Sequence, residues 1–142
     1  MPLTADRDIK ALLERTRTIA LVGASDRPDR PSWGVMRMLR RHGYRVIPMN
    51  PQIAGTELHG ERVVGSLREI AESIDMVDVF RRPLAAGEAV DEAIAAGAKA
   101  VWLQLGVVNH DAAARAEAAG LQVVMDRCPA IDIPRLGVAP IR

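Results

Sequence analysis

The sequence predicts an α/β domain, a doubly wound parallel sheet of five strands with helices on both faces. Short, nearly continuous apolar segments alternate with segments of helical period along the chain, as is typical of strands buried on both faces and joined by crossover helices. The 142 residues, 49% of them hydrophobic, suffice for one core that buries about two-thirds of the unfolded surface. These observations together indicate a single domain with right-handed crossovers.

We expect this domain to cover residues 1–142, with a leading helix in 1–17, a core in 18–129 and a C-terminal extension in 130–142. The leading helix is expected at residues 6–17, because Ile9, Leu12 and Leu13 recur on one helical face. The extension contains Pro134 and Pro140. It is therefore expected to be extended, lying over the sheet edge, on a second subunit or free.

The core elements follow from apolar strands and the turn residues between them. The first strand is expected at residues 19–22, and the first core helix at 33–42, closed by Gly43. A loop at 50–60 and a short extension at 62–64 precede a short helix, for which Ser66 and Glu69 form a capping pair. The other strands are expected at 45–49, 76–80, 100–105 and 122–125, and the other helices at 84–96 and 111–119.

Composition excludes several classes of partner. The net charge of +1 and the aromatic content of 3% disfavour nucleic acids and anionic membranes, which are bound by strongly basic surfaces or stacking rings. The single cysteine excludes an internal disulfide. No apolar run approaches the ~18 residues of a membrane span, so a soluble cytoplasmic protein is expected.

The most informative segment is the loop between the first strand and the first core helix, at residues 23–32. Gly23 stands where the strand ends, and a polar stretch with two prolines and two arginines leads into the helix. Backbone N–H groups at a helix N-terminus lack partners and lie at the positive end of the helix dipole. The loop therefore favours an anion such as phosphate.

This loop lacks the full glycine fingerprint of dinucleotide sites. Ser25 and Pro28 stand where the second and third glycines would be. The second strand runs into Asn50 and Pro51 instead of the carboxylate that would hold an NAD ribose. A different nucleotide is favoured, although Gly23 and Asn50 could also simply terminate their strands.

The unusual residues of the chain fall at the predicted carboxyl ends of the strands. In a doubly wound sheet, the ligand crevice lies outside these ends, where the strand order reverses next to the first strand. The positions concerned are 23–25, 50–51, 80–83, 104–106 and 126–128.

Five segments together carry a resemblance to a known family. They are ALVGASDRPDRPSWGVMRML, GYRVIPMNPQIAGTELHG, MVDVFRRP, GAKAVWLQLGVVN and AGLQVVMDRCPAIDIPRL. Over residues 18–136 the set resembles the small stand-alone CoA-binding proteins, which are similar in fold to the N-terminal CoA domain of the succinyl-CoA synthetase alpha subunit. This resemblance implies a Rossmann-like domain that holds coenzyme A or an acyl-CoA at the switch-point crevice.

The resemblance also implies which residues line the CoA pocket. The first loop is expected at the phosphates, the end of the second strand at the adenosine, and the end of the third strand along the adenine or the pantetheine arm. The implied residues are Gly23, Ala24, Ser25, Arg30 and Ser32, then Asn50 and Pro51, then Phe80, Arg81 and Arg82, and at the fourth strand Gln104, Leu105 and Gly106.

The chemistry of CoA agrees with these residue types. Its pyrophosphate and 3′-phosphate require cations or N–H donors, and the candidate cations are Arg27, Arg30, Arg81 and Arg82. Asn50 avoids the repulsion that a carboxylate would cause. The apolar arm has candidate contacts in Val79, Phe80 and Leu105. The alternative is that the arginines are ordinary solvated side chains of strand ends and loops.

No catalytic constellation is visible in the sequence. The three histidines lie on a helix end and two loops without metal-ligand spacing, and we expect them at the surface: His42, His59 and His110. Three aspartates flank strands without a partner base: Asp75, Asp78 and Asp126. The chain also has no P-loop that would hold ATP.

We therefore expect non-catalytic binding of CoA or an acyl-CoA, as a sensor, carrier or regulatory module. One alternative is an NAD(P)-binding oxidoreductase-type domain, and another is a subunit that completes an acyl-CoA ligase in trans. A third is a disulfide between Cys128 and the CoA thiol, although a small packed side chain is the favoured interpretation of Cys128. Association of the chain with itself is left open.

Overall fold

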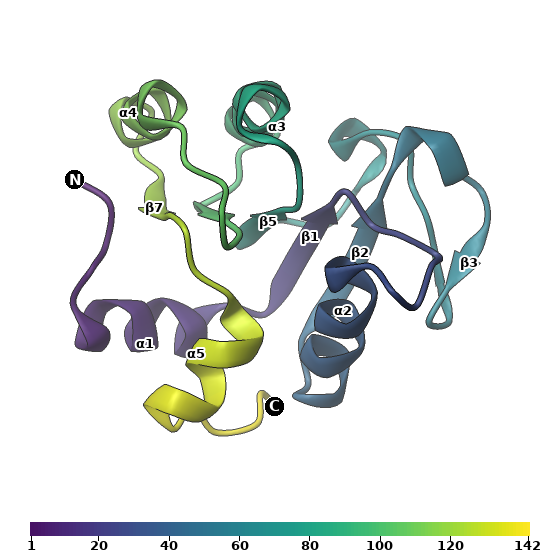
Figure 1. The fold of residues 1–142 in the computed structure, drawn as a ribbon, viewed down its shortest axis with the longest axis horizontal. Coiled ribbons are helices and arrows are strands. Elements are labelled where there is room, and N and C mark those ends of the chain that lie inside the picture. The colour runs from purple at the N-terminus through teal and green to yellow at the C-terminus, as the bar shows by residue number, and fades with distance from the viewer.

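A computed structural model describes residues 1–142, which form a five-stranded parallel sheet with helices on both faces (Figure 1). The strands are β1 (Thr18–Val22), β2 (Arg45–Met49), β5 (Met76–Val79), β6 (Ala100–Leu103) and β7 (Gln122–Val124). Their order is β2-β1-β5-β6-β7, and every neighbouring pair is parallel. The predicted doubly wound fold is confirmed, and the strand order reverses between β1 and β5.

The helices divide between the two faces of the sheet (Figure 1). One face carries α1 (Asp6–Arg15), α2 (Pro31–Arg41) and α5 (Pro129–Leu136), and the other carries α3 (Pro83–Ala95) and α4 (His110–Ala118). The crossover from β2 to β5 contains the small hairpin of β3 (Glu57–Leu58) and β4 (Glu61–Arg62), and the 3₁₀ turns η1 (Pro51–Ile53) and η2 (Leu67–Glu69). None of the helices has the length and apolar character that crossing a membrane requires.

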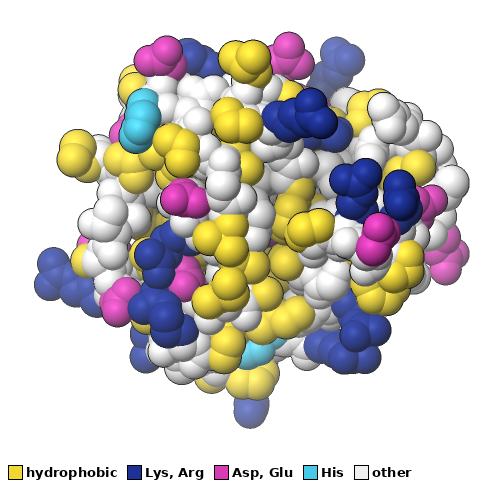
Figure 2. All heavy atoms as spheres, in the orientation of Figure 1, with side chains coloured by type: hydrophobic (Ala, Val, Ile, Leu, Met, Phe, Trp, Pro, Cys, Tyr) yellow, Lys and Arg dark blue, Asp and Glu magenta, His cyan; other side chains and the backbone are white.

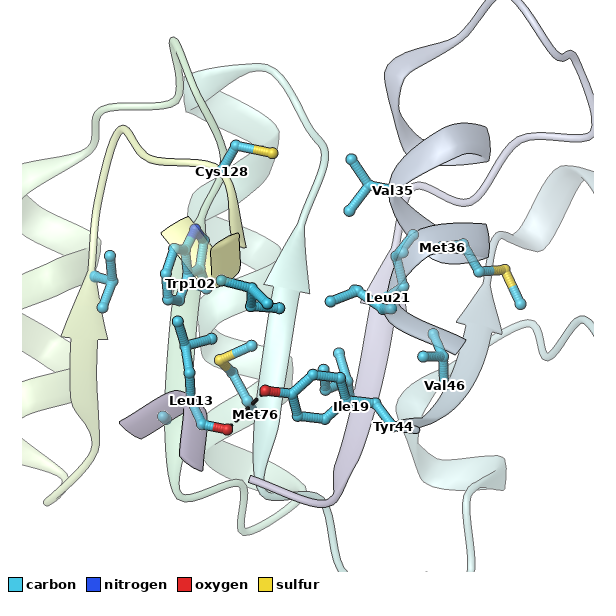
Figure 3. Packing of buried hydrophobic residues seen from close by; sticks show 14 of the residues in the cluster. Leu13, Ile19, Leu21, Val35, Met36, Tyr44, Val46, Met76, Trp102 and Cys128 are labelled. Atoms are coloured by element: carbon cyan, nitrogen blue, oxygen red, sulfur yellow. Dashed lines mark hydrogen bonds between the residues drawn. The ribbon is translucent and has the colours of Figure 1, made fainter. Parts of the chain in front are cut away.

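The sheet separates two hydrophobic cores of 20 buried residues each. The core under α1, α2 and α5 contains large side chains such as Leu13, Met36 and Trp102 (Figure 3). The core under α3 and α4 is built largely from alanines and valines, and small side chains let a helix approach the sheet closely. Both faces of the strands are therefore apolar, which explains their nearly continuous hydrophobic sequence.

Several predicted boundaries shift by one or two residues for local reasons. The first core helix begins at Pro31 rather than at residue 33, because proline suits the first helical position. The fourth strand ends at Leu103 rather than at residue 105. There Gly106 turns the chain with φ +80° and donates its N–H to Asp126 Oδ1 at 2.7 Å. The Ser66 and Glu69 pair caps η2, and Ser66 N–H donates to the Glu69 carboxylate at 2.8 Å.

The prediction of an extended C-terminal segment is wrong, because residues Pro129–Leu136 form α5. Pro129 occupies the first helical position, and Ile133 is buried in the core. Asp132, only 2% exposed, accepts hydrogen bonds from Arg127 and Arg135 at 2.8–3.1 Å. These interactions hold the helix despite the missing N–H of Pro134, which lies inside it.

The expectation of surface histidines holds only for His110, which is exposed. His42 is half-buried, and its Nε2 lies 3.0 Å from the Ala139 carbonyl oxygen. His59 is half-buried against the Trp33 ring, with Nε2 3.0 Å from the Trp33 carbonyl oxygen. These two rings therefore fix neighbouring segments rather than standing free in solvent.

Asp78 lies within β5 rather than beside it, and none of its surface is exposed. It aligns with Leu21 on β1 and Trp102 on β6, so its carboxyl group shares the core on the side of α1, α2 and α5. Neither carboxyl oxygen has a hydrogen-bond partner. Burial raises the pKa of Asp78 well above its usual value, and the neutral acid is favoured in the folded protein.

Asp78→Asn is expected to reduce the pH dependence of folding stability. In the unfolded chain Asp78 ionises above pH ~4, whereas the raised pKa keeps it neutral when folded. The contribution of Asp78 to the free energy of unfolding is therefore fully present below pH ~4. It is lost as the pH rises through the pKa that Asp78 has in the folded protein, and the free energy then falls by up to about 1.4 kcal/mol per pH unit. Urea unfolding between pH 4 and 8 should show a steeper loss for the wild type than for the variant. Parallel curves for the two proteins would contradict this expectation.

Candidate functional site

The loop after β1 is anchored to the end of β2. The backbone N–H groups of Gly23 and Ala24 both donate to the Met49 carbonyl oxygen, at 3.0 and 3.2 Å. The Asn50 amide Nδ2 donates to the Ala24 carbonyl oxygen at 2.8 Å. Asn50 therefore holds the loop in place, a role that its position at a strand end did not reveal.

The same loop passes directly over the end of β5. Gly23 has φ +88°, and a Cβ atom built there would lie 2.0 Å from the Phe80 carbonyl oxygen. No residue with a side chain fits this position without moving one of the two segments. The glycine thus brings the first loop against the Phe80-Arg81-Arg82 segment.

A polar cavity of about 600 Å³ lies where these segments meet. The start of α2, the end of β2 and the start of α3 complete its walls. Its lining residues are Gly23, Ala24, Ser25, Asp26, Arg27, Arg30, Pro31, Ser32, Asn50, Gln52, Ile53, Phe80, Arg81, Arg82 and Ala85. The cavity therefore lies at the carboxyl ends of β1 and β5, where the strand order reverses.

Positive charge dominates this cavity. Arg30, Arg81 and Arg82 form no ion pair within the protein, whereas Arg27 Nε lies 3.4 Å from the carboxylate of Asp29. The single carboxylate in the lining, that of Asp26, is exposed, so water screens it. A bound anion would have three guanidinium groups without competing carboxylates.

Backbone donors add to the positive charge. Arg30 and Arg82 are the N-cap residues of α2 and α3, and neither helix has a side-chain hydrogen bond at its N-terminus. The N–H groups of Ser25 and Asp26 have no acceptor within the protein, while the Ser25 hydroxyl accepts from Arg27 N–H at 3.1 Å. Two helix N-termini and one loop therefore offer N–H groups at the cavity.

A second, largely apolar cavity of about 740 Å³ adjoins the first. Pro31, Phe80, Arg81 and Arg82 line both, so the two cavities share a wall. The other lining residues are Gly34, Val35, Pro83, Gln104, Leu105, Gly106, Val107, Cys128 and Ala130. Hydrophobic side chains gather in the middle of this face of the molecule, between α2 and α5 (Figure 2).

The apolar cavity contains one unpaired polar group. The Gln104 side chain is only 6% exposed, and its Oε1 has no hydrogen-bond partner. An unmade hydrogen bond at a buried acceptor costs roughly 1–3 kcal/mol. Rotation of the amide that turned Oε1 towards the cavity would let a ligand with an N–H donor remove this cost.

All of the predicted site residues except Pro51 and Val79 line one of the two cavities, and Val79 is buried in the core under α3 and α4. Pro51 is exposed in η1 and lies outside both. Sequence reasoning missed residues contributed by loops, by η1 and by the starts of α2, α3 and α5: Asp26, Gln52, Ile53, Ala85, Pro31, Gly34, Val35, Val107 and Ala130. The helical spacing of Pro31, Gly34 and Val35 is the one signal that points to some of them.

Comparison with known proteins gives a family match over most of the chain. The model of the CoA binding domain family matches residues 17–134. The chain is also 41% identical over 121 residues to the uncharacterized protein YneT of Bacillus subtilis (strain 168). The aligned region covers 85% of this chain and 88% of that protein.

Solved structures show the same fold. Cell-free ID.343 from Thermus thermophilus is 41% identical, with a TM-score of 0.89 over 94% of this chain and 99% of that one. A more distant match is the dinucleotide forming acetyl-coenzyme A synthetase 1 of Ca. Korarchaeum cryptofilum. It is 21% identical with a TM-score of 0.68, and the match covers 78% of this chain and 26% of that larger one. At this identity the likeness concerns the fold alone.

Gly23→Ala is expected to lower the free energy of unfolding by roughly 2–4 kcal/mol, because positive φ strain and the clash with Phe80 add. Gly55→Ala is the matched control, since Gly55 has φ +89° but nothing within 4 Å of the added Cβ. This control measures the cost of a positive φ alone, and its free energy of unfolding should fall by only about 1 kcal/mol. Equal losses in denaturant titrations would show that the approach to Phe80 is unimportant.

Proposed function

This chain belongs to the CoA binding domain family, and on that premise we propose that it binds coenzyme A or an acyl-CoA at the two joined cavities without catalysis. In this proposal the protein is a sensor, carrier or regulatory module. The observation that carries it is the junction of a cationic cavity with an apolar one, through Phe80, Arg81 and Arg82.

The two halves of CoA differ chemically in the same way as the two cavities. The nucleotide half carries a pyrophosphate and a 3′-phosphate, for which Arg30, Arg81 and Arg82 offer guanidinium groups free of carboxylates. The pantetheine half is less polar and has amide N–H groups, for which Gln104 offers an unpaired acceptor. The bound cofactor would supply a thiol that carries acyl groups as thioesters.

The residues around the cavities support a role in binding rather than in catalysis. Histidine lines neither cavity, so no base stands beside Cys128, the single nucleophilic thiol. Arg81 and Arg82 bind and orient anionic groups, and Phe80 and Val35 exclude water from the apolar half.

Completion of an acyl-CoA ligase in trans is a second candidate function. It is favoured by the match of this fold to about a quarter of the synthetase chain from Ca. Korarchaeum cryptofilum. Co-purification of the tagged protein with an ATP-binding partner, and acyl-CoA formation by the mixture alone, would support this function over a sensor or carrier.

Calorimetric titration with CoA, dephospho-CoA, NAD and ATP is the direct test of the proposed function. CoA should bind more tightly than dephospho-CoA by about 1–2 kcal/mol, roughly five- to thirtyfold, because the missing 3′-phosphate removes a charge-assisted contact. NAD should bind weakly, since Asn50 replaces the ribose-binding carboxylate. Heat from NAD with none from CoA at millimolar concentration would overturn the proposal.

Arg81→Ala and Arg82→Ala should each weaken CoA binding by roughly 1–3 kcal/mol if they contact phosphate. Arg68→Ala is the matched control, because Arg68 is exposed, forms no ion pair and lies outside both cavities. The loss should shrink as salt concentration rises, since salt screens exposed charges. Unchanged affinity in both cavity variants would remove these arginines from the site.

A further inference from the structure

Cys128 is the only cysteine of the chain and lines the apolar cavity. It is 7% exposed and is the N-cap residue of α5. Its sulfur points across towards Val35 of α2, which lines the same cavity (Figure 3). The thiol thus faces the space between the two helices, at the positive end of α5.

Gln104 provides a second and independent sign that a ligand belongs in this cavity. Its buried Oε1 lacks a partner, and its side chain lines the same space as Cys128. The pantetheine arm offers N–H donors of the kind that this oxygen lacks, and this arm ends in a thiol. An arm bound in this cavity would lie in a space that both Gln104 and Cys128 line.

The segment that carries Cys128 is held from several sides. The Arg127 carbonyl oxygen accepts from Trp102 Nε1 at 2.8 Å. The Arg127 guanidinium donates to both carboxylate oxygens of the buried Asp132, at 2.8 and 3.1 Å. Asp132 also binds Arg135, which reaches Asp6 of α1 at 3.0 Å. The sulfur is therefore presented at a fixed position rather than on a free loop.

From these observations, and resting on the proposed function, we infer that Cys128 is a site of thiol–disulfide exchange with a CoA disulfide. The phosphates of one CoA half are held in the cationic cavity, and its sulfur meets Cys128 in the apolar one. The outer rim of the apolar cavity consists of exposed residues, among them Pro31, Leu105 and Gly106. The second CoA half leaves through this rim.

The exchange needs no oxidant other than the CoA disulfide itself. Cys128 loses its proton to solvent, and its thiolate attacks one sulfur of the disulfide. A bond forms between Cys128 Sγ and that sulfur, the original S–S bond breaks, and its electron pair leaves on the other CoA as a thiolate. One protein thiol and one disulfide become one mixed disulfide and one CoA thiol.

The test is intact mass spectrometry of the reduced protein after incubation with CoA disulfide without other oxidants. One CoA adduct per chain is expected, and dithiothreitol should remove it. Pantethine, the matching disulfide without phosphates, should react at least tenfold more slowly at equal concentration. Arg81→Ala should lose most of this preference, whereas Arg68→Ala should keep it. Because the chain has one cysteine, the adduct identifies its own site.

Calorimetric titration of the same protein with reduced CoA separates this inference from the proposed function. No adduct on a protein that binds CoA would overturn the inference and leave the proposed function standing. Equal rates with pantethine would also overturn it, since Cys128 would then be an accessible thiol without nucleotide guidance. Absence of both the adduct and CoA binding would overturn both.

Discussion

The approach of Gly23 to the Phe80 carbonyl oxygen is the constraint on which the rest of the site depends. Because β1 and β5 are neighbours whose following helices cover opposite faces of the sheet, a gap opens where their chains diverge. A residue without a side chain lets the first loop close over one edge of that gap. The loop and the Arg81-Arg82 pair therefore share one cavity, and α2 and α3 both begin at its wall. A bulkier residue would force these two segments apart, and the cationic cavity would lose one of its sides.

The same divergence of chains explains why one cavity is cationic and its neighbour apolar. The cationic cavity is lined by helix starts and loops, which contribute backbone N–H groups and guanidinium groups. The second lies between α2 and α5, and helices that pack on a sheet present apolar side chains there. Placing Arg30, Arg81 and Arg82 around one space without an ion-pair partner costs repulsion that solvent only partly screens. An anion relieves this repulsion, and the adjoining apolar wall favours an anion that carries an apolar extension.

Sequence predicted the parts of the molecule that local patterns determine. Apolar strands and their turn residues predicted the sheet, and the topology of a parallel sheet then placed Arg81, Gln104 and their neighbours at one edge. The helix α5 was missed because Pro134 and Pro140 suggested an extended chain, whereas its stability comes from Asp132 binding Arg127 and Arg135. Arg135 also binds Asp6 of α1, a contact between distant parts of the sequence that no local pattern reveals. Gly34 and Val35 were missed for a related reason, since they reach the cavity through the packing of α2.

Two unpaired polar side chains lie on the same face and at the same end of the sheet. Asp78 aligns with Trp102, and Gln104 follows Trp102 by two residues, so both belong to the side that α1, α2 and α5 cover. Elsewhere in this core, buried polar groups are satisfied, as when Thr16 Oγ1 donates to the Leu12 carbonyl oxygen at 2.7 Å. A buried polar side chain without a hydrogen-bond partner is expected beside a cavity where function, rather than stability, selects the residue. Gln104 lines the cavity, and in the proposed complex a pantetheine N–H group supplies its partner. Asp78 is fully enclosed and lines neither cavity, so its unpaired carboxyl group bears on the stability of the core beside Leu21 and Trp102 rather than on ligand contact.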